Sequence, residues 1–327
     1  MHNPTAPKTV LLGDISHGDY VSLALAAPGG RAEHLRRYAC SSLVAFEEAV
    51  DNFLADEGQP PLAGAAFSMS GWGVDGEVDL IHYRFDVRRE SLQTMLGLSQ
   101  VRIVNNFVAK ALAIPLLQAD DHVTVCGGAP RSEQAMAIIG PTMGFGGALL
   151  IPDGMGRRIA SHCEGGHADF TPGNALEIEI LKLLMMKYGQ VSRERALSIP
   201  GIADLWQCLA TMDGDMTPAP EAQEIVAMAW AQDARSQQVI RIQTEIFGMT
   251  ASDFALIMGV RGGIYLSGDW LDLVGDLFDH DIFASRFYPK GRATSYLQDI
   301  PVLQITAPEI ELLGLSTLFD TGAPNDS

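Results

Sequence analysis

The apolar and polar positions of this chain change repeatedly between a strand pattern and helical spacing. Residues 9–15 (TVLLGDI) and 20–27 (YVSLALAA) are apolar or alternating runs around a Gly-containing turn, and they predict a hairpin. Residues 42–55 carry apolar side chains at helical spacing behind Ser42, with Gly58 just beyond them. Residues 101–105 alternate again and give way to helix formers that stop at Ile114-Pro115. The chain therefore predicts a mixed α/β protein.

The rest of the chain continues this succession. Asn174 precedes a strongly apolar helix with Glu177 three residues later, which is the spacing of a capping box. The strand, Gly-rich turn and strand of residues 135–151 repeat the arrangement of residues 9–27, so the pattern indicates a duplicated architecture. We predict further strands at 63–69, 78–85, 264–266 and 300–305, further helices at 89–96, 175–188, 192–197, 271–278 and 308–319, and helix over most of 220–260 with an interruption near 248–252.

Composition narrows the class of protein. The 327 residues are 47% hydrophobic, which is enough for two packed lobes. A formal net charge of −18 disfavours nucleic acid and anionic membrane surfaces as partners. The four cysteines form no CxxC pair, which suits a reducing compartment, and no apolar run is long enough to span a bilayer. We expect a cytoplasmic protein with neither a nucleic-acid nor a membrane partner.

Asn105 and Asn106 mark the point where the strand of residues 101–105 becomes a helix. In open α/β folds ligands bind at the carboxyl ends of strands, so both amides are candidate site residues. The alternative is that the two residues only form a turn. The segment VRIVNNFVAKALAIP resembles one in bacterial glucokinases of the hexokinase/actin-like superfamily that usually contains IINDFTA and AIP. The resemblance implies that Asn105 binds glucose and that Asn106 occupies the position of the catalytic Asp.

A second candidate site is the segment EGGHADF. Glu164 and His167 flank two glycines that let the backbone bend, so a carboxylate and an imidazole could together bind sugar hydroxyls. A polar loop with a capping role is one alternative. A zinc site using His162 and Cys163 is another, although the spacing matches no closed zinc pattern. The segment resembles the EGGH of glucokinases, and residues 190–195 resemble their VSxERxLSG segment; together they imply a hexose site of Asn105, Glu164, His167 and Glu194.

Three glycine-containing segments resemble the nucleotide-binding turns of the same family. Residues 13–19 resemble GDxGGTN, but Ser16 and His17 replace the Gly pair, where their side chains would crowd a phosphate, and Asp19 adds negative charge. Residues 140–146 resemble GxGTGxG, with Met143 at the position of a hydroxyl donor. Residues 262–268 resemble GGVxIxGG. The implied nucleotide or phosphate ligands are Gly13, Asp14, Gly18, Thr142, Gly144, Gly146, Gly262, Gly263 and Gly268, with Asp14 also helping to hold Mg²⁺.

The resemblance covers nearly the whole chain and implies its architecture. The fold would be the two-lobe actin-like ATPase (ribonuclease H-like) fold, with duplicated α/β domains around an interlobe cleft. Residues 1–116 plus 305–327 would form the small lobe, and residues 117–304 the large lobe. The implied ligands are a hexose, namely glucose, with ATP and Mg²⁺ as cofactors, and the implied assembly is a homodimer.

The chemistry itself stays open at this stage. An Asn amide cannot accept the proton of the attacking hydroxyl, and general-base assistance contributes about 10²- to 10⁴-fold in rate. Phosphoryl transfer depends chiefly on positioning and electrostatics, so loss of the base need not abolish it. The first hypothesis is a hexose-binding, glucokinase-like protein in which phosphotransfer from ATP is weak or lost. The second is an active ATP-dependent glucokinase that forms glucose 6-phosphate. The third is a structural partner of an active paralogue. The sequence leaves open the sugar, the phosphate donor, the oligomeric state and any regulatory partner.

Overall fold

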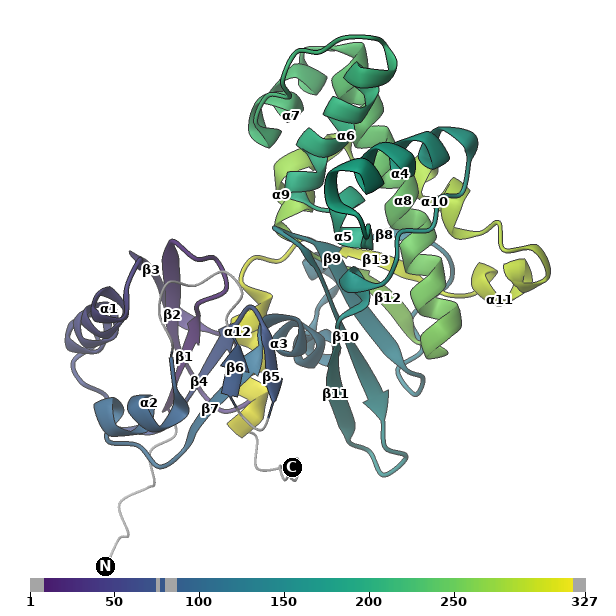
Figure 1. Ribbon diagram of the computed structural model, residues 1–327. Coiled ribbons are helices and arrows are strands. Elements are labelled where there is room, and N and C mark those ends of the chain that lie inside the picture. Colours follow the sequence, from purple (N-terminus) through teal and green to yellow (C-terminus); the bar gives the residue numbers. More distant parts are fainter. Residues whose placement is uncertain (1–8, 75–76, 80–86, 320–327) are drawn as a thin grey trace, which may run out of the picture. The chain divides into compact units, whose positions relative to one another are not determined.

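The computed structural model describes residues 9–74, 77–79 and 87–319 (Figure 1). The chain divides into two units, Met1–Gln118 with Ala307–Ser327, and Ala119–Thr306. Each unit contains its own sheet and its own helices. Most of the predicted strand at residues 78–85 lies outside the described residues.

The smaller unit is built on a five-stranded sheet of order β3-β2-β1-β4-β7. β1 and β2 form the predicted antiparallel hairpin, and β4 pairs in parallel with both β1 and β7. A separate pair, β5 with β6, is antiparallel. The elements are β1 (Thr9–Asp14), β2 (Tyr20–Ala26), β3 (Glu33–Ala39), α1 (Leu43–Asp56), β4 (Leu62–Met69), β5 (Trp72–Val74), β6 (Glu77–Asp79), α2 (Arg89–Leu96), β7 (Val101–Asn105), α3 (Asn106–Ala113), η1 (Ile114–Leu116), α12 (Ile310–Ser316) and η6 (Thr317–Phe319).

The alternation along β1 divides the apolar side chains of this unit between the two faces of the sheet. Leu11 packs with residues of α1 and α2 on one face. Val10 and Leu12 pack on the other face with residues of α3 and α12. The carboxyl-terminal helix is therefore part of the amino-terminal unit, because its apolar side covers a sheet face that β1 would otherwise expose.

Gly314 lets α12 approach α3 closely. A Cβ atom at this position would lie 1.7 Å from the carbonyl oxygen of Ala109. Because backbone cannot yield as a flexible side chain does, we expect Gly314→Ala to lower the free energy of unfolding by about 1–3 kcal/mol or more. Urea unfolding followed by circular dichroism measures this loss. The control Asp51→Ala changes an exposed position of α1 and should stay within about 0.5 kcal/mol of the wild type; equal midpoints for the two variants would contradict the prediction.

The larger unit is built on a six-stranded sheet of order β11-β10-β9-β12-β13-β8. β9 and β10 form an antiparallel hairpin, and β12 pairs in parallel with β9 and β13. The elements are η2 (Ala119–Asp121), β8 (His122–Cys126), β9 (Met136–Pro141), β10 (Phe145–Pro152), β11 (Arg158–Cys163), η3 (Gly165–His167), α4 (Ala175–Tyr188), α5 (Arg193–Ala196), α6 (Ile199–Met212), α7 (Ala222–Trp230), α8 (Ala234–Met258), β12 (Gly263–Leu266), α9 (Asp269–Val274), η4 (Gly275–Leu277), α10 (His280–Phe287), η5 (Gly291–Ala293), α11 (Thr294–Gln298) and β13 (Val302–Ile305).

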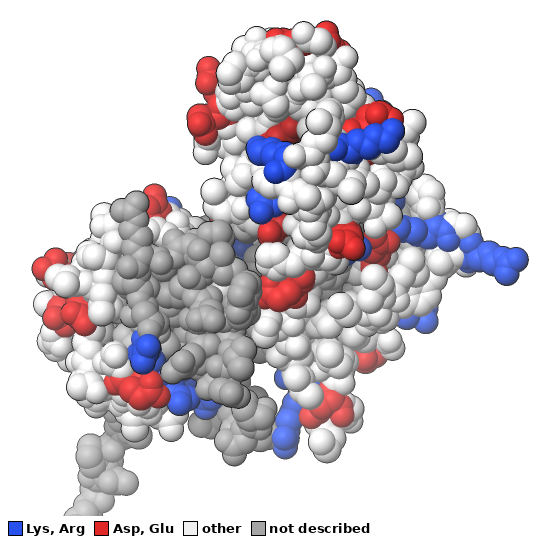
Figure 2. Space-filling model, in the orientation of Figure 1, with Lys and Arg blue, Asp and Glu red and all other residues white. Residues whose placement is uncertain are grey.

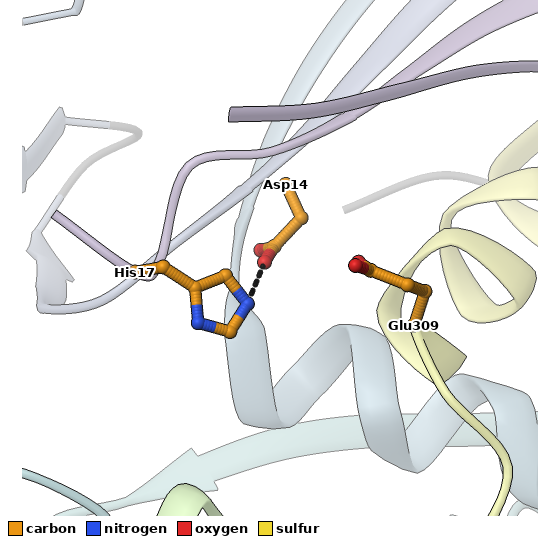
Figure 3. A group of neighbouring side chains, drawn as sticks. All are labelled: Asp14, His17 and Glu309. Atoms are coloured by element: carbon orange, nitrogen blue, oxygen red, sulfur yellow. Dashed lines mark ion pairs between the residues drawn. The ribbon is translucent and has the colours of Figure 1, made fainter. Parts of the chain in front are cut away.

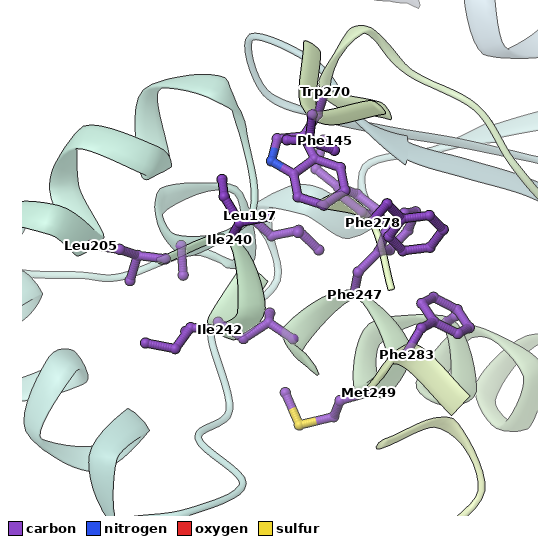
Figure 4. Packing of buried hydrophobic residues seen from close by; sticks show 14 of the residues in the cluster. Phe145, Leu197, Leu205, Ile240, Ile242, Phe247, Met249, Trp270, Phe278 and Phe283 are labelled. Atoms are coloured by element: carbon purple, nitrogen blue, oxygen red, sulfur yellow. The ribbon is translucent and has the colours of Figure 1, made fainter. Parts of the chain in front are cut away.

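An aromatic cluster forms the centre of this unit (Figure 4). Phe247 of α8 makes edge-to-face contacts with Trp270 and Phe283, at ring-centroid distances of 6.2 and 5.5 Å. Such pairs add about 0.5–1.5 kcal/mol each beyond the area that they bury. The Trp270 indole nitrogen donates to Gln243 Oε1 at 2.6 Å, so its polar end is satisfied inside the core.

The predicted interruption of helix near residues 248–252 is wrong, because α8 is continuous from Ala234 to Met258. Gly248 is needed inside the helix: a Cβ there would lie 2.2 Å from the carbonyl oxygen of Phe283 in α10. The Ser252 hydroxyl donates to the carbonyl of Met249 at 2.7 Å. A close helix crossing, rather than a helix end, explains the small and polar residues in this stretch.

None of the helices formed by the described residues is long and apolar enough to cross a membrane. On the face drawn in Figure 2, acidic and basic side chains are interspersed among uncharged ones. The described residues of the drawn face form no continuous basic surface for phosphate backbones, and the sequence pI of about 4.7 is low.

Candidate functional site

The larger unit brings Glu164, His167 and Glu194 together. His167 lies between the two carboxylates, with Nε2 3.7 Å from Glu164 Oε2 and Nδ1 3.4 Å from Glu194 Oε1. The side chains of Glu164 and His167 are 44% and 47% exposed, whereas that of Glu194 is 21% exposed. Two carboxylates and an imidazole at an accessible surface can accept and donate hydrogen bonds to adjacent hydroxyl groups of one small ligand.

The glycines between Glu164 and His167 are required by packing. A Cβ on Gly165 would lie 2.3 Å from the ring of Phe254, and one on Gly166 would lie 2.4 Å from the carbonyl oxygen of Phe145. The His167 N–H donates to the carbonyl of Glu164 at 3.0 Å, which closes the turn of η3. The close packing of this turn against the core fixes the backbone positions of Glu164 and His167.

Backbone hydrogen bonds hold α5 against the same segment. The Arg193 N–H donates to the carbonyl of Ala168 at 2.8 Å, and the Phe170 N–H donates to the carbonyl of Val191 at 2.9 Å. These bonds place Glu194, in the first turn of α5, beside His167. Residues 27 positions apart in the chain are thus held as one cluster by backbone pairing.

The turn between β9 and β10, predicted to bind phosphate, borders this cluster. The Thr142 hydroxyl accepts a hydrogen bond from the Gly144 N–H at 3.3 Å, and a Cβ on Gly144 would lie 2.8 Å from Glu194 Oε2. Met143 points outward and is exposed. Gly144 therefore lies next to Glu194, and its N–H links it to the Thr142 hydroxyl.

The third glycine segment meets the β9 end of that turn. Gly268 adopts φ +154°, and a Cβ there would lie 2.3 Å from the carbonyl oxygen of Pro141. Gly140 is equally restricted, because its Cβ would lie 1.5 Å from the carbonyl oxygen of Ser267. β9 and β12 are parallel neighbours, so both segments leave the sheet at the same edge, where ligands bind in open α/β folds. Gly262 and Gly263 lie at the opposite end of β12.

In the smaller unit, Asn105 is the N-cap of α3. Its Oδ1 accepts hydrogen bonds from the N–H groups of Phe107 and Val108 at 2.8 and 3.3 Å, and its Nδ2 donates to the carbonyl of Gly71 at 2.7 Å. Asn106 is the first residue of the helix and is buried. The structural role considered for Asn105 is therefore present. Capping does not exclude ligand binding, since Nδ2 carries two N–H donors and the Gly71 carbonyl takes one of them.

Asp14 lies at the end of β1 and is buried. Its carboxylate accepts hydrogen bonds from Ser68 and Ser16 and lies 3.1 Å from His17 Nε2. Burial alone would raise the pKa of Asp14, but the hydrogen bond and charge of His17, with the two hydroxyl donors, lower it below the usual value. The sequence predicted that His17 crowds a phosphate position. The structure adds that its imidazole is directed to the carboxylate expected to help hold Mg²⁺.

Sequence reasoning missed a buried ion pair close to this turn. Lys110 Nζ of α3 lies 3.0 Å from Glu311 Oε1 of α12, with side chains 6% and 7% exposed. Burial raises the pKa of Glu311, Lys110 opposes this shift, and the nearby Asp14 charge adds to it. The lysine could be read as an exposed helical residue, and no local pattern connects it to a glutamate 201 positions later.

We expect Lys110→Met to lower the free energy of unfolding by about 3–5 kcal/mol near neutral pH, because it leaves the Glu311 carboxylate buried without a counter-charge. The folded-state pKa of Glu311 is raised, so the carboxyl is neutral at low pH. As the pH rises through that pKa, more molecules carry the buried charge, and the folded state of the variant becomes less stable. The loss should therefore be smaller at acidic pH. Urea unfolding of the variant at two pH values measures it.

Two further variants make this prediction specific. Lys110→Met combined with Glu311→Gln should recover most of the lost stability. Lys182→Met is the control: it removes the lysine of an exposed ion pair, that of Lys182 with Glu179 at 2.8 Å on α4. It should lower the free energy of unfolding by only about 0–1 kcal/mol. A pH-independent loss in Lys110→Met, unrelieved by the second substitution, would rule out the buried charge as its cause.

Comparison with known proteins decides the family. The glucokinase family model matches residues 11–321. This chain belongs to the glucokinase family. It is 33% identical to a glucokinase-like protein of Caulobacter vibrioides over 93% of this chain and 94% of that protein. It is 34% identical to a glucokinase of Chromobacterium violaceum over 96% of this chain and 90% of that protein.

The fold of this glucokinase-family chain is shared with solved structures. A glucokinase of Balamuthia mandrillaris, crystallised in complex with glucose, superposes with a TM-score of 0.81 at 19% identity, covering 96% of this chain and 94% of that one. The predicted actin-like ATPase fold is thus confirmed. The assignments of individual site residues remain predictions. Among the described residues, the ligand group suggested for zinc at residues 162–167 does not gather as one metal site.

Proposed function

We propose that this glucokinase-family protein binds a hexose, with glucose the first candidate, and transfers phosphate from ATP slowly or not at all. Glu164, His167 and Glu194 would bind the sugar hydroxyls, and the resemblance adds Asn105 to these ligands. Asn106 stands where the resemblance places the catalytic base. Homodimerisation and a cytoplasmic location, which the resemblance implies, belong to the same proposal and stay untested.

The observation that carries the sugar half is the His167 imidazole held between two carboxylates at 3.4 and 3.7 Å. A sugar presents neighbouring hydroxyls that both donate and accept, and this trio offers both functions within one small surface. Its parts are fixed by close packing at Gly165 and Gly166 and by backbone bonds to α5. A preorganised site of this kind loses less entropy when it binds a ligand.

The residues at the predicted phosphate-binding turns favour MgATP binding less than the Glu164, His167 and Glu194 cluster favours sugar binding. Mg²⁺ requires oxygen ligands in near-octahedral geometry and retains several waters. At the first turn, however, the side chain beside Asp14 is the His17 imidazole, with Nε2 3.1 Å from the carboxylate, and a nitrogen donor does not suit Mg²⁺. The set does not fit a magnesium-bound phosphate as it stands. Met143 also contributes a thioether where the family usually has a hydroxyl.

Glucose binding and glucose-dependent ADP release, measured on the same preparation, test the proposal. Calorimetry and the fluorescence of the buried Trp206 and Trp270 would report binding. Binding with ADP release at the level of a no-sugar control is the expected result. Turnover at about 1–10³ s⁻¹, usual for enzymes, would instead identify an active glucokinase. Absence of any hexose binding would contradict the sugar half of the proposal.

A further inference from the structure

Three potential metal ligands from distant parts of the sequence meet in the smaller unit (Figure 3). Asp14 ends β1, His17 lies in the turn that follows, and Glu309 is the N-cap residue of α12. One ligand atom of each residue lies within 4.8 Å of those of the other two. Among the described residues, no other group of three or more His, Cys, Asp or Glu side chains gathers in this way.

Glu309 supplies the observation that points to a ligand. Its side chain is only 6% exposed. One oxygen, Oε1, accepts from the Ser22 hydroxyl and from Arg37 at 2.9 and 2.8 Å. The other, Oε2, is buried and has no hydrogen-bond partner among the described residues. A buried carboxylate oxygen without a partner is costly, and a bound cation is one of the few arrangements that satisfies it. The Glu309 carboxylate points toward that of Asp14 in Figure 3.

The other two ligands are oriented by their neighbours. The Ser68 and Ser16 hydroxyls hold the Asp14 carboxylate, and the His17 ring stacks on Tyr20 at a centroid distance of 4.4 Å. Such supporting contacts fix the orientation of metal ligands, and removing them commonly lowers metal affinity by about 10- to 100-fold. The His17 side chain is 21% exposed, which leaves one side of the group open to incoming ions.

We propose that Asp14, His17 and Glu309 form a binding site for a divalent transition metal ion, with Zn²⁺ the best match. One imidazole nitrogen and two carboxylate oxygens suit Zn²⁺, whereas Mg²⁺ and Ca²⁺ prefer oxygen ligands alone. Zn²⁺ binds such ligands at about 2.0–2.2 Å, so the three ligand atoms, which lie within 4.8 Å of one another, must draw closer around the ion. The site needs no nucleotide, and an ion bound there would occupy Asp14.

Arg37 and Lys110 set the charge of this site. Arg37 pairs with Glu309 Oε1, and Lys110 pairs with Glu311 nearby, so two cations already balance part of the negative charge. Asp14, Glu309 and Glu311 together carry three negative charges when ionised. Three carboxylates and two cations leave a local charge of about −1, and a bound dication would change it to about +1. This costs less electrostatic energy than placing a dication among groups with no net charge.

Calorimetric titration of the purified full chain with Zn²⁺ alone, without sugar or nucleotide, tests this site. We expect one strong site in the wild type and at least 10-fold weaker binding in both His17→Gln and Glu309→Gln. His34→Gln is the matched control: His34 Nδ1 lies 3.0 Å from Glu57 Oε2 in the same unit, but no third ligand joins that pair among the residues that the structure describes. This variant should bind Zn²⁺ as the wild type does. Near-ultraviolet circular dichroism establishes that each variant is folded.

Titration with Co²⁺ gives a second readout, since its visible absorption reports the ligands directly. A spectrum altered by His17→Gln and unaltered by His34→Gln supports coordination by His17. Zn²⁺ binding that is absent in the wild type, or that both ligand variants retain in full, would overturn the proposal and leave His17 as the counter-ion of Asp14. Neither glucose nor ATP enters the assay, so its outcome does not depend on the proposed sugar-binding function.

Discussion

Asn106→Asp is expected to raise glucose-dependent ADP release by about 10²- to 10⁴-fold over the wild type, the usual contribution of a general base. The substitution is nearly isosteric and falls on the first residue of α3, where a carboxylate interacts favourably with the helix dipole. It should therefore leave the backbone in place. A coupled assay of ADP formation, with saturating glucose and MgATP, measures the change.

The adjacent amide provides the control for this substitution. Asn105→Asp makes the same chemical change one residue earlier and keeps an oxygen that can accept from the Phe107 and Val108 N–H groups. It removes the donor to the Gly71 carbonyl and places no base at position 106. We expect no gain in rate from it. If Asn106→Asp binds glucose but stays at the wild-type rate, the missing base is not the main defect, and the turns bearing His17 and Met143 become the cause.

Local features of this chain could be predicted from the sequence because they depend on neighbouring residues. The change from β7 to α3 at Asn105 follows from alternation that gives way to helix formers. The capping box of α4 was also visible: Asn174 Oδ1 accepts from the Glu177 N–H at 2.9 Å, and Glu177 reaches back to the Gly173 N–H at 2.6 Å. Spacing within one turn of helix is enough for such predictions.

What could not be predicted depends on pairs of residues far apart in the chain. Glu309 falls inside the helix predicted at residues 308–319, yet it precedes α12, adopts φ +51° and lies beside Asp14 of β1. Gly248 was expected to interrupt a helix. In the structure it allows close contact with α10, which lies about 35 residues later in the chain, and no local pattern shows that contact. Short-range patterns cannot reveal which element will cover which face of a sheet, and both examples depend on that choice.

The candidate sugar site could be predicted from the sequence only in part. The segment EGGH and Glu194 were recognised from resemblance, and the structure brings Glu164, His167 and Glu194 together. The reason for the two glycines was different from the expected one, since they make room for Phe254 and Phe145. The sequence could indicate the residue types at this site but not the core that holds them.

Glu164→Ala and His167→Ala are each expected to weaken glucose binding by about 10- to 100-fold. A hydrogen bond to a charged group contributes about 1.5–3 kcal/mol, and 1.4 kcal/mol corresponds to a factor of ten in affinity. Both side chains are nearly half exposed, so their removal should leave the fold intact. Calorimetry with glucose measures the loss. His162→Ala, an exposed histidine of β11 five residues earlier, should bind glucose as the wild type does.

Deoxyglucose analogues test whether the weaker glucose binding of these variants comes from a lost direct contact with a sugar hydroxyl. A site built to hydrogen-bond a hydroxyl discriminates strongly against the analogue that lacks it, because its polar groups are left unpaired. If Glu164 binds one glucose hydroxyl, Glu164→Ala should weaken glucose binding strongly and should add little to the weaker binding of the deoxyglucose that lacks that hydroxyl. This non-additivity separates direct contact from a general disturbance, which would weaken every sugar equally. Wild-type affinity in both Glu164→Ala and His167→Ala would show that the trio does not bind the sugar.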